Sequence, residues 1–63
     1  MKDTYVVRLV NYDKKVAVYI ETEYTDMDKA IESTRNNKEY PEEAGWEWDA
    51  AYPKSVYERM KEL

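Results

Sequence analysis

The sequence predicts a small α+β protein, and three observations lead to this fold class. Residues 5–10 hold five apolar side chains in six positions, which is typical of a strand buried on both faces. Residues 16–24 alternate between two sets of side chains with the period of a half-buried strand. Two stretches with helical spacing flank a further alternating segment that begins at Trp46. We therefore expect one domain over residues 1–63, with the element order ββαβα.

The first two strands are expected to form an antiparallel hairpin. Residues 4–11 make the first strand, and residues 11–15 make a polar turn in which Asn and Asp side chains bond to the backbone. The second strand covers residues 16–24. One of its faces carries Val16, Val18, Ile20, Thr22 and Tyr24, and the other carries Ala17, Tyr19, Glu21 and Glu23.

A helix of about three turns is predicted next. Thr25 is the expected N-cap, with Asp28 completing a capping box, and Asn36-Asn37 marks the end. In the connector 38–45, we expect Pro41 to start a single helical turn that Gly45 closes, because glycine adopts positive φ without strain. The stripe of the helix that faces the sheet consists of Met27, Ala30, Ile31 and Thr34.

Residues 46–52 have the alternation of a third strand, which Pro53 ends. Its expected core row is Trp46, Trp48, Ala50 and Tyr52, and its outer row is Glu47, Asp49 and Ala51. Trp46 and Trp48 share one side of the strand, and the alternative is that both are exposed interface anchors. Residues 54–63 return to helical spacing, with Ser55 as a possible cap. The apolar stripe of this last helix is Val56, Tyr57, Met60 and Leu63, and Met27 and Met60 are expected in the core.

A right-handed crossover through the first helix places the third strand beside the first. The expected sheet is antiparallel with order 2-1-3, and its helices pack mainly on one face. The last helix either joins the first helix there or packs at the end of the sheet. The first strand has two apolar rows, so the row that faces the helix stays open: either Tyr5, Val7 and Leu9, or Val6, Val10 and Tyr12.

Composition excludes several kinds of function. The chain has no Cys and no His, so it lacks thiolate and imidazole metal ligands and the commonest general base. It also lacks a Gly-rich phosphate loop, and Ser33 and Ser55 have no base partner. We therefore expect a protein that is not an enzyme and that holds no metal or cofactor. The missing Cys residues and the absence of a long apolar stretch favour a cytoplasmic protein with no membrane contact.

Charge is distributed unevenly along the chain. The net charge is −4, with a local +2 over residues 1–20 and a local −6 over residues 21–63. This balance disfavours direct binding to nucleic acid or to an anionic membrane, and it favours a basic protein partner. Acidic strand residues and the acidic connector are expected near one another, with Tyr19 and Tyr40 adding aromatic contact. The candidate partner-binding residues are Tyr19, Glu21, Glu23, Tyr40, Glu42, Glu43, Glu47 and Asp49.

Three interpretations of these residues stay open. In the simplest, they are ordinary solvated positions of a charged protein. In the second, rigid carboxylates imitate a phosphate backbone and engage the basic groove of a nucleic-acid-handling protein. The protein is then an inhibitor or adaptor of the kind that phages and mobile elements use against host enzymes. In the third, the protein is a structural or self-assembling module, a homodimer paired through the free edge of the second strand, although Glu21 and Glu23 are expected to oppose close pairing there.

Overall fold

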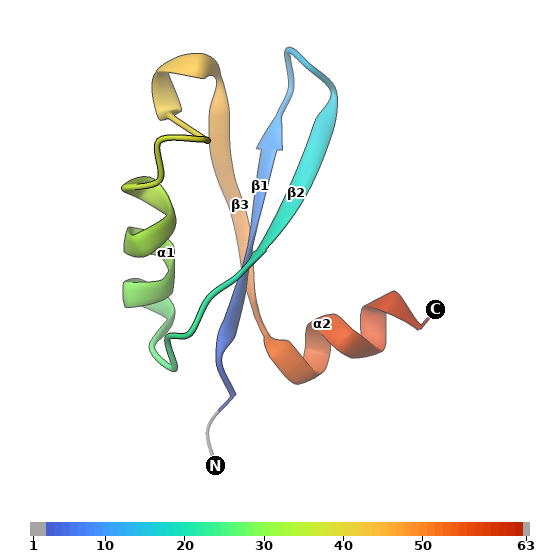
Figure 1. Cartoon of the computed structure of the whole chain (residues 1–63). Helices are drawn as coiled ribbons and strands as arrows, with labels where there is room; N and C mark the ends of the chain where they lie inside the picture. Colours follow the sequence, from blue (N-terminus) through green and yellow to red (C-terminus); the bar gives the residue numbers. More distant parts are fainter. Residues whose placement is uncertain (1–2, 63) are drawn as a thin grey trace.

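A computed structural model describes residues 3–62 and shows a three-stranded antiparallel sheet with order β2-β1-β3 and two helices (Figure 1). The elements are β1 (Tyr5–Asn11), β2 (Val16–Glu21), α1 (Met27–Arg35), the 3-10 turn η1 (Glu42–Ala44), β3 (Trp46–Pro53) and α2 (Lys54–Lys61). The predicted α+β class, element order and sheet order are confirmed.

The core lies between the sheet and α1. Val7 and Leu9 of β1 are completely buried and form a cluster with Ala30 of α1 and Trp46 of β3. The row that contains Tyr5, Val7 and Leu9 therefore faces α1, which resolves the alternative that the sequence left open. β1 holds this central position because its apolar residues can be covered on both faces and along both edges.

Asn11 connects the hairpin turn to the turn η1. Its side-chain oxygen accepts a hydrogen bond from the Lys14 backbone N–H (3.1 Å), and its side-chain nitrogen donates to the Ala44 carbonyl (3.1 Å). Asn11 is 1% exposed, so both bonds satisfy a buried polar group. Gly45 follows η1 with a φ of 95°, as its predicted role in closing that turn requires.

The start of α1 and the end of β2 differ from the prediction. The N-cap of α1 is Asp26 and not Thr25, because the Asp26 carboxylate accepts hydrogen bonds from the backbone N–H groups of Asp28 (2.9 Å) and Lys29 (3.2 Å). Regular pairing of β2 ends at Glu21 and does not extend through residue 24. The chain beyond still follows β1, since the Thr22 N–H donates to the Tyr5 carbonyl (3.0 Å).

A β-bulge divides β3 into two halves that present different faces. Trp46 and Trp48 lie opposite Asn11 and Leu9, but Ala50 and Tyr52 lie opposite Arg8 and Val6, with the register shifting between Arg8 and Leu9. Asp49 is thus the extra residue of the bulge. The expectation that one row holds both tryptophans, Ala50 and Tyr52 is wrong, because the bulge moves Ala50 and Tyr52 to the face away from α1.

The tryptophans lie on the α1 side, as expected. Trp46 is buried and Trp48 is partly buried. The indole N–H of Trp48 donates to the Thr34 hydroxyl (2.6 Å), and the Arg35 guanidinium lies 5.3 Å from the Trp48 ring centroid. These contacts join the first half of β3 to α1.

The helix α2 lies on the other side of the sheet from α1 (Figure 1). α2 begins at the end of the sheet, where Pro53 closes β3, and its Tyr57 ring packs on Tyr19 of β2. Of the two positions left open for the last helix, it therefore does not join α1 on the core face. α2 has no buried residue, and Met60 is 37% exposed. Met27, the first residue of α1, is 46% exposed. The prediction that Met27 and Met60 lie in the core is therefore wrong. Leu63 lies outside the described residues.

The start of α2 has no side-chain cap. Ser55 does not fill this predicted role, because α2 begins at Lys54, directly after Pro53, and the Ser55 hydroxyl donates to the Asp3 carboxylate (2.5 Å). The Lys54 N–H donates to the Thr4 carbonyl (2.8 Å), which joins the start of α2 to the chain just before β1. Neither helix of the described chain is long and apolar enough to cross a membrane.

Candidate functional site

The sheet face away from α1, here called the open face, is the surface that gathers the largest share of the predicted site residues. Side chains of directly paired residues share a face, so the strand register defines its members. They are Val6, Arg8, Val10, Ala17, Tyr19, Glu21, Glu47, Ala50 and Tyr52, with the bulge residue Asp49 beside Arg8. Tyr57 and Met60 of α2 extend this surface next to Tyr19.

An ion pair occupies the centre of the open face. The Arg8 guanidinium donates to the Asp49 carboxylate, and each side chain is 33% exposed. Partial burial disfavours the charge on Arg8, but the Asp49 carboxylate favours it through charge and hydrogen bonding, so the pKa of Arg8 lies above its ordinary value. Coulombic interaction with Tyr19 and Tyr52 raises the pKa of Arg8 further. The Asp49 carboxylate is therefore paired with Arg8, and the bulge positions Asp49 beside Arg8.

A second ion pair lies toward the end of the open face where α2 begins. The Lys54 ammonium is 3.5 Å from the Glu21 carboxylate, and both side chains are about half exposed. Of the predicted carboxylates on the sheet, Glu47 is the one on the open face with no ion pair inside residues 3–62. Glu21 and Glu47 lie opposite Val6 and Val10 on the two outer strands, which separates them by roughly 16 Å.

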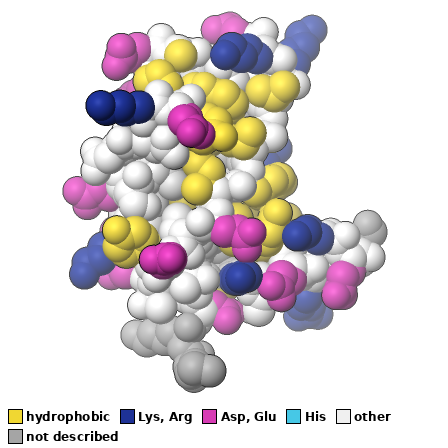
Figure 2. All heavy atoms as spheres, in the orientation of Figure 1, with side chains coloured by type: hydrophobic (Ala, Val, Ile, Leu, Met, Phe, Trp, Pro, Cys, Tyr) yellow, Lys and Arg dark blue, Asp and Glu magenta, His cyan; other side chains and the backbone are white. Residues whose placement is uncertain are grey.

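Apolar and aromatic groups, and not free carboxylates, make up most of the open face. Val6 is fully buried and Val10 is 7% exposed, although neither faces α1. The Tyr19 and Tyr57 ring centroids are 5.2 Å apart, and the Lys61 ammonium lies 5.1 Å from the Tyr57 ring centroid. Figure 2 shows hydrophobic side chains in a band over the sheet that reaches α2, with charged side chains along its borders. The expected acidic sheet face is therefore an aromatic face with two ion pairs.

The remaining predicted site residues lie elsewhere. Tyr40 packs edge-on against Trp46, with ring centroids 5.0 Å apart, so it belongs to the α1 side of the sheet and does not join Tyr19. Glu42 and Glu43 are exposed in η1, just before the start of β3. Glu23 is exposed beyond the end of β2. The structure thus brings Tyr19, Glu21, Glu47 and Asp49 to one face and leaves the other four outside it.

Sequence reasoning missed Tyr52, Tyr57 and Met60 as members of this surface. Tyr52 was assigned to the core because simple alternation from Trp46 places it there. The available signal was Ala50-Ala51, a pair of small residues that fits either face, next to an aspartate within reach of Arg8. Tyr57 and Met60 are at the predicted apolar positions of α2, but the side of the sheet on which that helix packs has no sequence signature.

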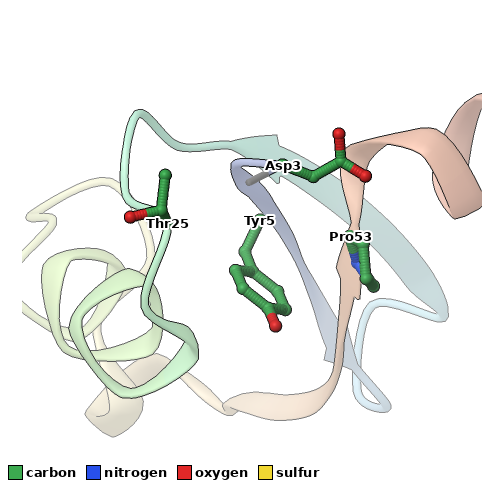
Figure 3. A pocket seen from close by; sticks show the side chains of 4 residues that line it. All are labelled: Asp3, Tyr5, Thr25 and Pro53. Atoms are coloured by element: carbon green, nitrogen blue, oxygen red, sulfur yellow. The ribbon is translucent and has the colours of Figure 1, made fainter. Parts of the chain in front are cut away.

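A separate hollow lies where β1, β3 and the loop before α1 meet. It is lined by Asp3, Tyr5, Thr25 and Pro53, and the Tyr5 ring lies between Thr25 and Pro53 (Figure 3). Its one carboxylate, Asp3, already accepts the hydrogen bond from Ser55. We assign it no chemical role, because it offers no second polar group positioned toward the same point.

The acidic side chains of residues 3–62 are spread over the surface and do not gather at one point. Within residues 3–62, no three Asp or Glu side chains are close enough together to hold a metal ion. The chain matches no protein-family model, and comparisons with curated proteins and with solved structures find no match.

Proposed function

We propose that this protein acts by binding another protein through its open face, and not by catalysis. The observation that carries the proposal is the position of Tyr19 and Tyr52 beside the Arg8–Asp49 ion pair, with Tyr57 packed on Tyr19. Tyrosine and arginine are the residue types enriched at the centres of protein interfaces, because they combine large contact area with polar ends. Tyr19 is 41% exposed, so part of its ring is free for contact.

Charge supports a basic partner. The chain carries a net charge of −4, and the carboxylates of Glu42, Glu43 and Glu47 have no ion pair with residues 3–62. These three groups lie at or near the end of β3 where η1 leads into the strand. Glu47 is held on a strand, so less ordering entropy is lost when it meets a cation than for a carboxylate on a mobile tail.

A narrower form of the proposal names the class of partner. An inhibitor or adaptor of the kind that phages and mobile elements produce would place Glu42, Glu43 and Glu47 in the basic groove of a nucleic-acid-handling protein. Asp49 and Glu21 would contribute less, because Arg8 and Lys54 already neutralise them. If this form is right, a DNA duplex and this protein compete for the same partner. If the protein binds its partner without displacing the DNA duplex, it is an adaptor that contacts another surface of that partner.

Reversing one free charge on the open face tests the proposal. We expect Glu47→Lys to reduce capture of a basic partner at least about tenfold, because it replaces attraction by like-charge repulsion at the interface. The measurement is a tagged pull-down from nuclease-treated bacterial lysate, with captured proteins quantified by mass spectrometry. Asp49 is unsuitable for this test, since a lysine there would confront Arg8 and disturb the fold.

The matched control is Glu32→Lys, which makes the same charge change at an exposed position of α1, on the opposite side of the sheet. A partner kept by wild type and by Glu32→Lys, but lost with Glu47→Lys, supports the open face. Equal loss with both variants would indicate that only total charge matters. Equal retention by both would contradict the proposal.

A further inference from the structure

We propose that β2 pairs with β2 of a second copy of this chain, antiparallel and about a two-fold axis at Tyr19, to form a continuous six-stranded sheet. This inference does not depend on the partner proposed above, because it uses the outer edge of β2. An exposed strand edge offers unpaired N–H and C=O groups that can template another strand.

The edge of β2 lacks the usual protections. Between Val16 and Glu21 the strand contains no proline, its pairing with β1 shows no register shift, and Glu21 is its single charged residue. The outer strand on the other side differs, because β3 carries the Asp49 bulge and ends on Pro53. Bulges and prolines are the features that discourage edge pairing, so β2 is the edge that remains available.

Hydrogen-bond alternation fixes the register of the pairing. Thr22 bonds toward β1 through Tyr5, so Ile20, Val18 and Val16 also bond inward, and Ala17, Tyr19 and Glu21 direct their backbone groups outward. An antiparallel partner must match outward residues with outward residues. Full overlap is reached when Tyr19 faces Tyr19 of the partner subunit and Ala17 faces Glu21 of the partner subunit. This register forms about six intermolecular backbone hydrogen bonds.

Charge favours the same register. Lys14 and Lys15 precede β2, Glu21 is its last residue, and Glu23 follows it. With Tyr19 on the two-fold axis, Lys15 of each copy lies opposite Glu23 of the other, so both ends of the interface join unlike charges. Parallel pairing would instead place lysines beside lysines. In an antiparallel dimer of this register, Glu21 and Glu23 would therefore not oppose self-pairing.

Apolar contacts extend across the same junction. In this register Val18 lies opposite Ile20 of the partner subunit on the α1 side of the sheet, where both residues are only half-buried in one chain. α2 projects past the sheet on the side of β2 (Figure 1). Its exposed Met60 shares a hollow with Tyr19 and Tyr57. Two such helices related by the axis would lie beside the Tyr19 pair at the centre of the dimer.

A charge exchange tests both the dimer and its register. Mass is measured by analytical ultracentrifugation up to millimolar protein, with circular dichroism to show that each variant is folded. Wild type should reach twice the 7.6 kDa of one chain. Lys15→Glu alone and Glu23→Lys alone should each weaken dimerisation roughly tenfold, because each turns two attractive pairs into repulsive ones. Mixing the two single variants should restore a dimer, since every pair is then of opposite sign.

A backbone variant provides an independent readout. Ala17→Pro removes an outward N–H that β1 does not use, so the monomer should fold while the dimer is lost. Exposed edge positions of this kind tolerate proline in folded proteins. A wild-type monomer at every concentration would overturn the proposal. A dimer that Ala17→Pro leaves intact, or whose single charge variants do not recover on mixing, would overturn the edge pairing and its register.

Discussion

Leu9→Ala is expected to remove most of the free energy of unfolding of the protein at room temperature. Leu9 is 0% exposed in the central strand, opposite Trp48 on one side and Val18 on the other. Truncating a buried leucine to alanine costs about 2–5 kcal/mol, through lost burial and the cavity that remains. A domain of this size is stabilised by only about 3–5 kcal/mol in total. Urea unfolding followed by far-UV circular dichroism measures the change.

The matched control for Leu9→Ala is Val56→Ala, an apolar truncation at a residue that is 40% exposed on α2. We expect it to change the free energy of unfolding by less than about 1 kcal/mol. If Leu9→Ala loses no more stability than Val56→Ala, β1 is not the centre of the core. A stabilising osmolyte restores the folded baseline if the leucine variant is too unstable to titrate.

Trp46→Ala is expected to have a similarly large effect, about 3–5 kcal/mol of unfolding free energy. Trp46 is 6% exposed, belongs to the buried cluster and meets the edge of Tyr40. Removing the indole opens the space between β3 and α1 and leaves Tyr40 without its aromatic partner. The same urea titration applies, with Trp48 remaining as a fluorescent reporter.

Trp46→Phe separates the aromatic contact from simple volume. Phenylalanine keeps a ring against Tyr40 and fills most of the space, so we expect less than half of the loss caused by alanine. Equal destabilisation by alanine and phenylalanine would contradict this assignment. It would point instead to a feature that only an indole can supply at this position.

Local patterns were enough to predict most of the fold. The run at residues 5–10, the alternation from Val16 and the helical stripe through Ala30 depend on neighbours in sequence, and the sheet order followed from placing the most apolar strand in the middle. The single turn before Gly45 was also predicted, because glycine there satisfies a backbone conformation that other residues resist. Such features depend on backbone geometry that each short segment carries by itself.

The candidate site was less predictable because it depends on a tertiary irregularity. The small pair Ala50-Ala51 beside Asp49 is a weak signal, because it does not show by itself that the strand gains one residue against β1. This insertion nevertheless turns Tyr52 from the core to the open face. Pairing of Asp49 with Arg8 accompanies the bulge and removes one carboxylate from the predicted acidic surface. The position of α2 is equally a tertiary matter, since its apolar stripe could have packed on either side of the sheet.

The bulge at Asp49 also links the two proposals. The bulge interrupts the regular pairing of β3, so β2 is the outer strand with a regular edge. It also brings Tyr52 to the face that carries Arg8 and Tyr19. A dimer through β2 would therefore place two open faces side by side on one sheet. The partner proposed for that face would then meet a surface twice as wide, with Glu47 of each copy on the strand farthest from the junction.

The position of the Tyr52 ring tests this account most directly, because the open face exists as described only if the bulge turns Tyr52 away from α1. Nuclear Overhauser contacts in the isotope-labelled protein report it. We expect contacts from the Tyr52 ring to the side chains of Val6 and Arg8, and none to Ala30 or Ile31. Contacts from Tyr52 to Ala30 or Ile31 would show unbroken alternation through β3, and the aromatic binding face would have to be abandoned.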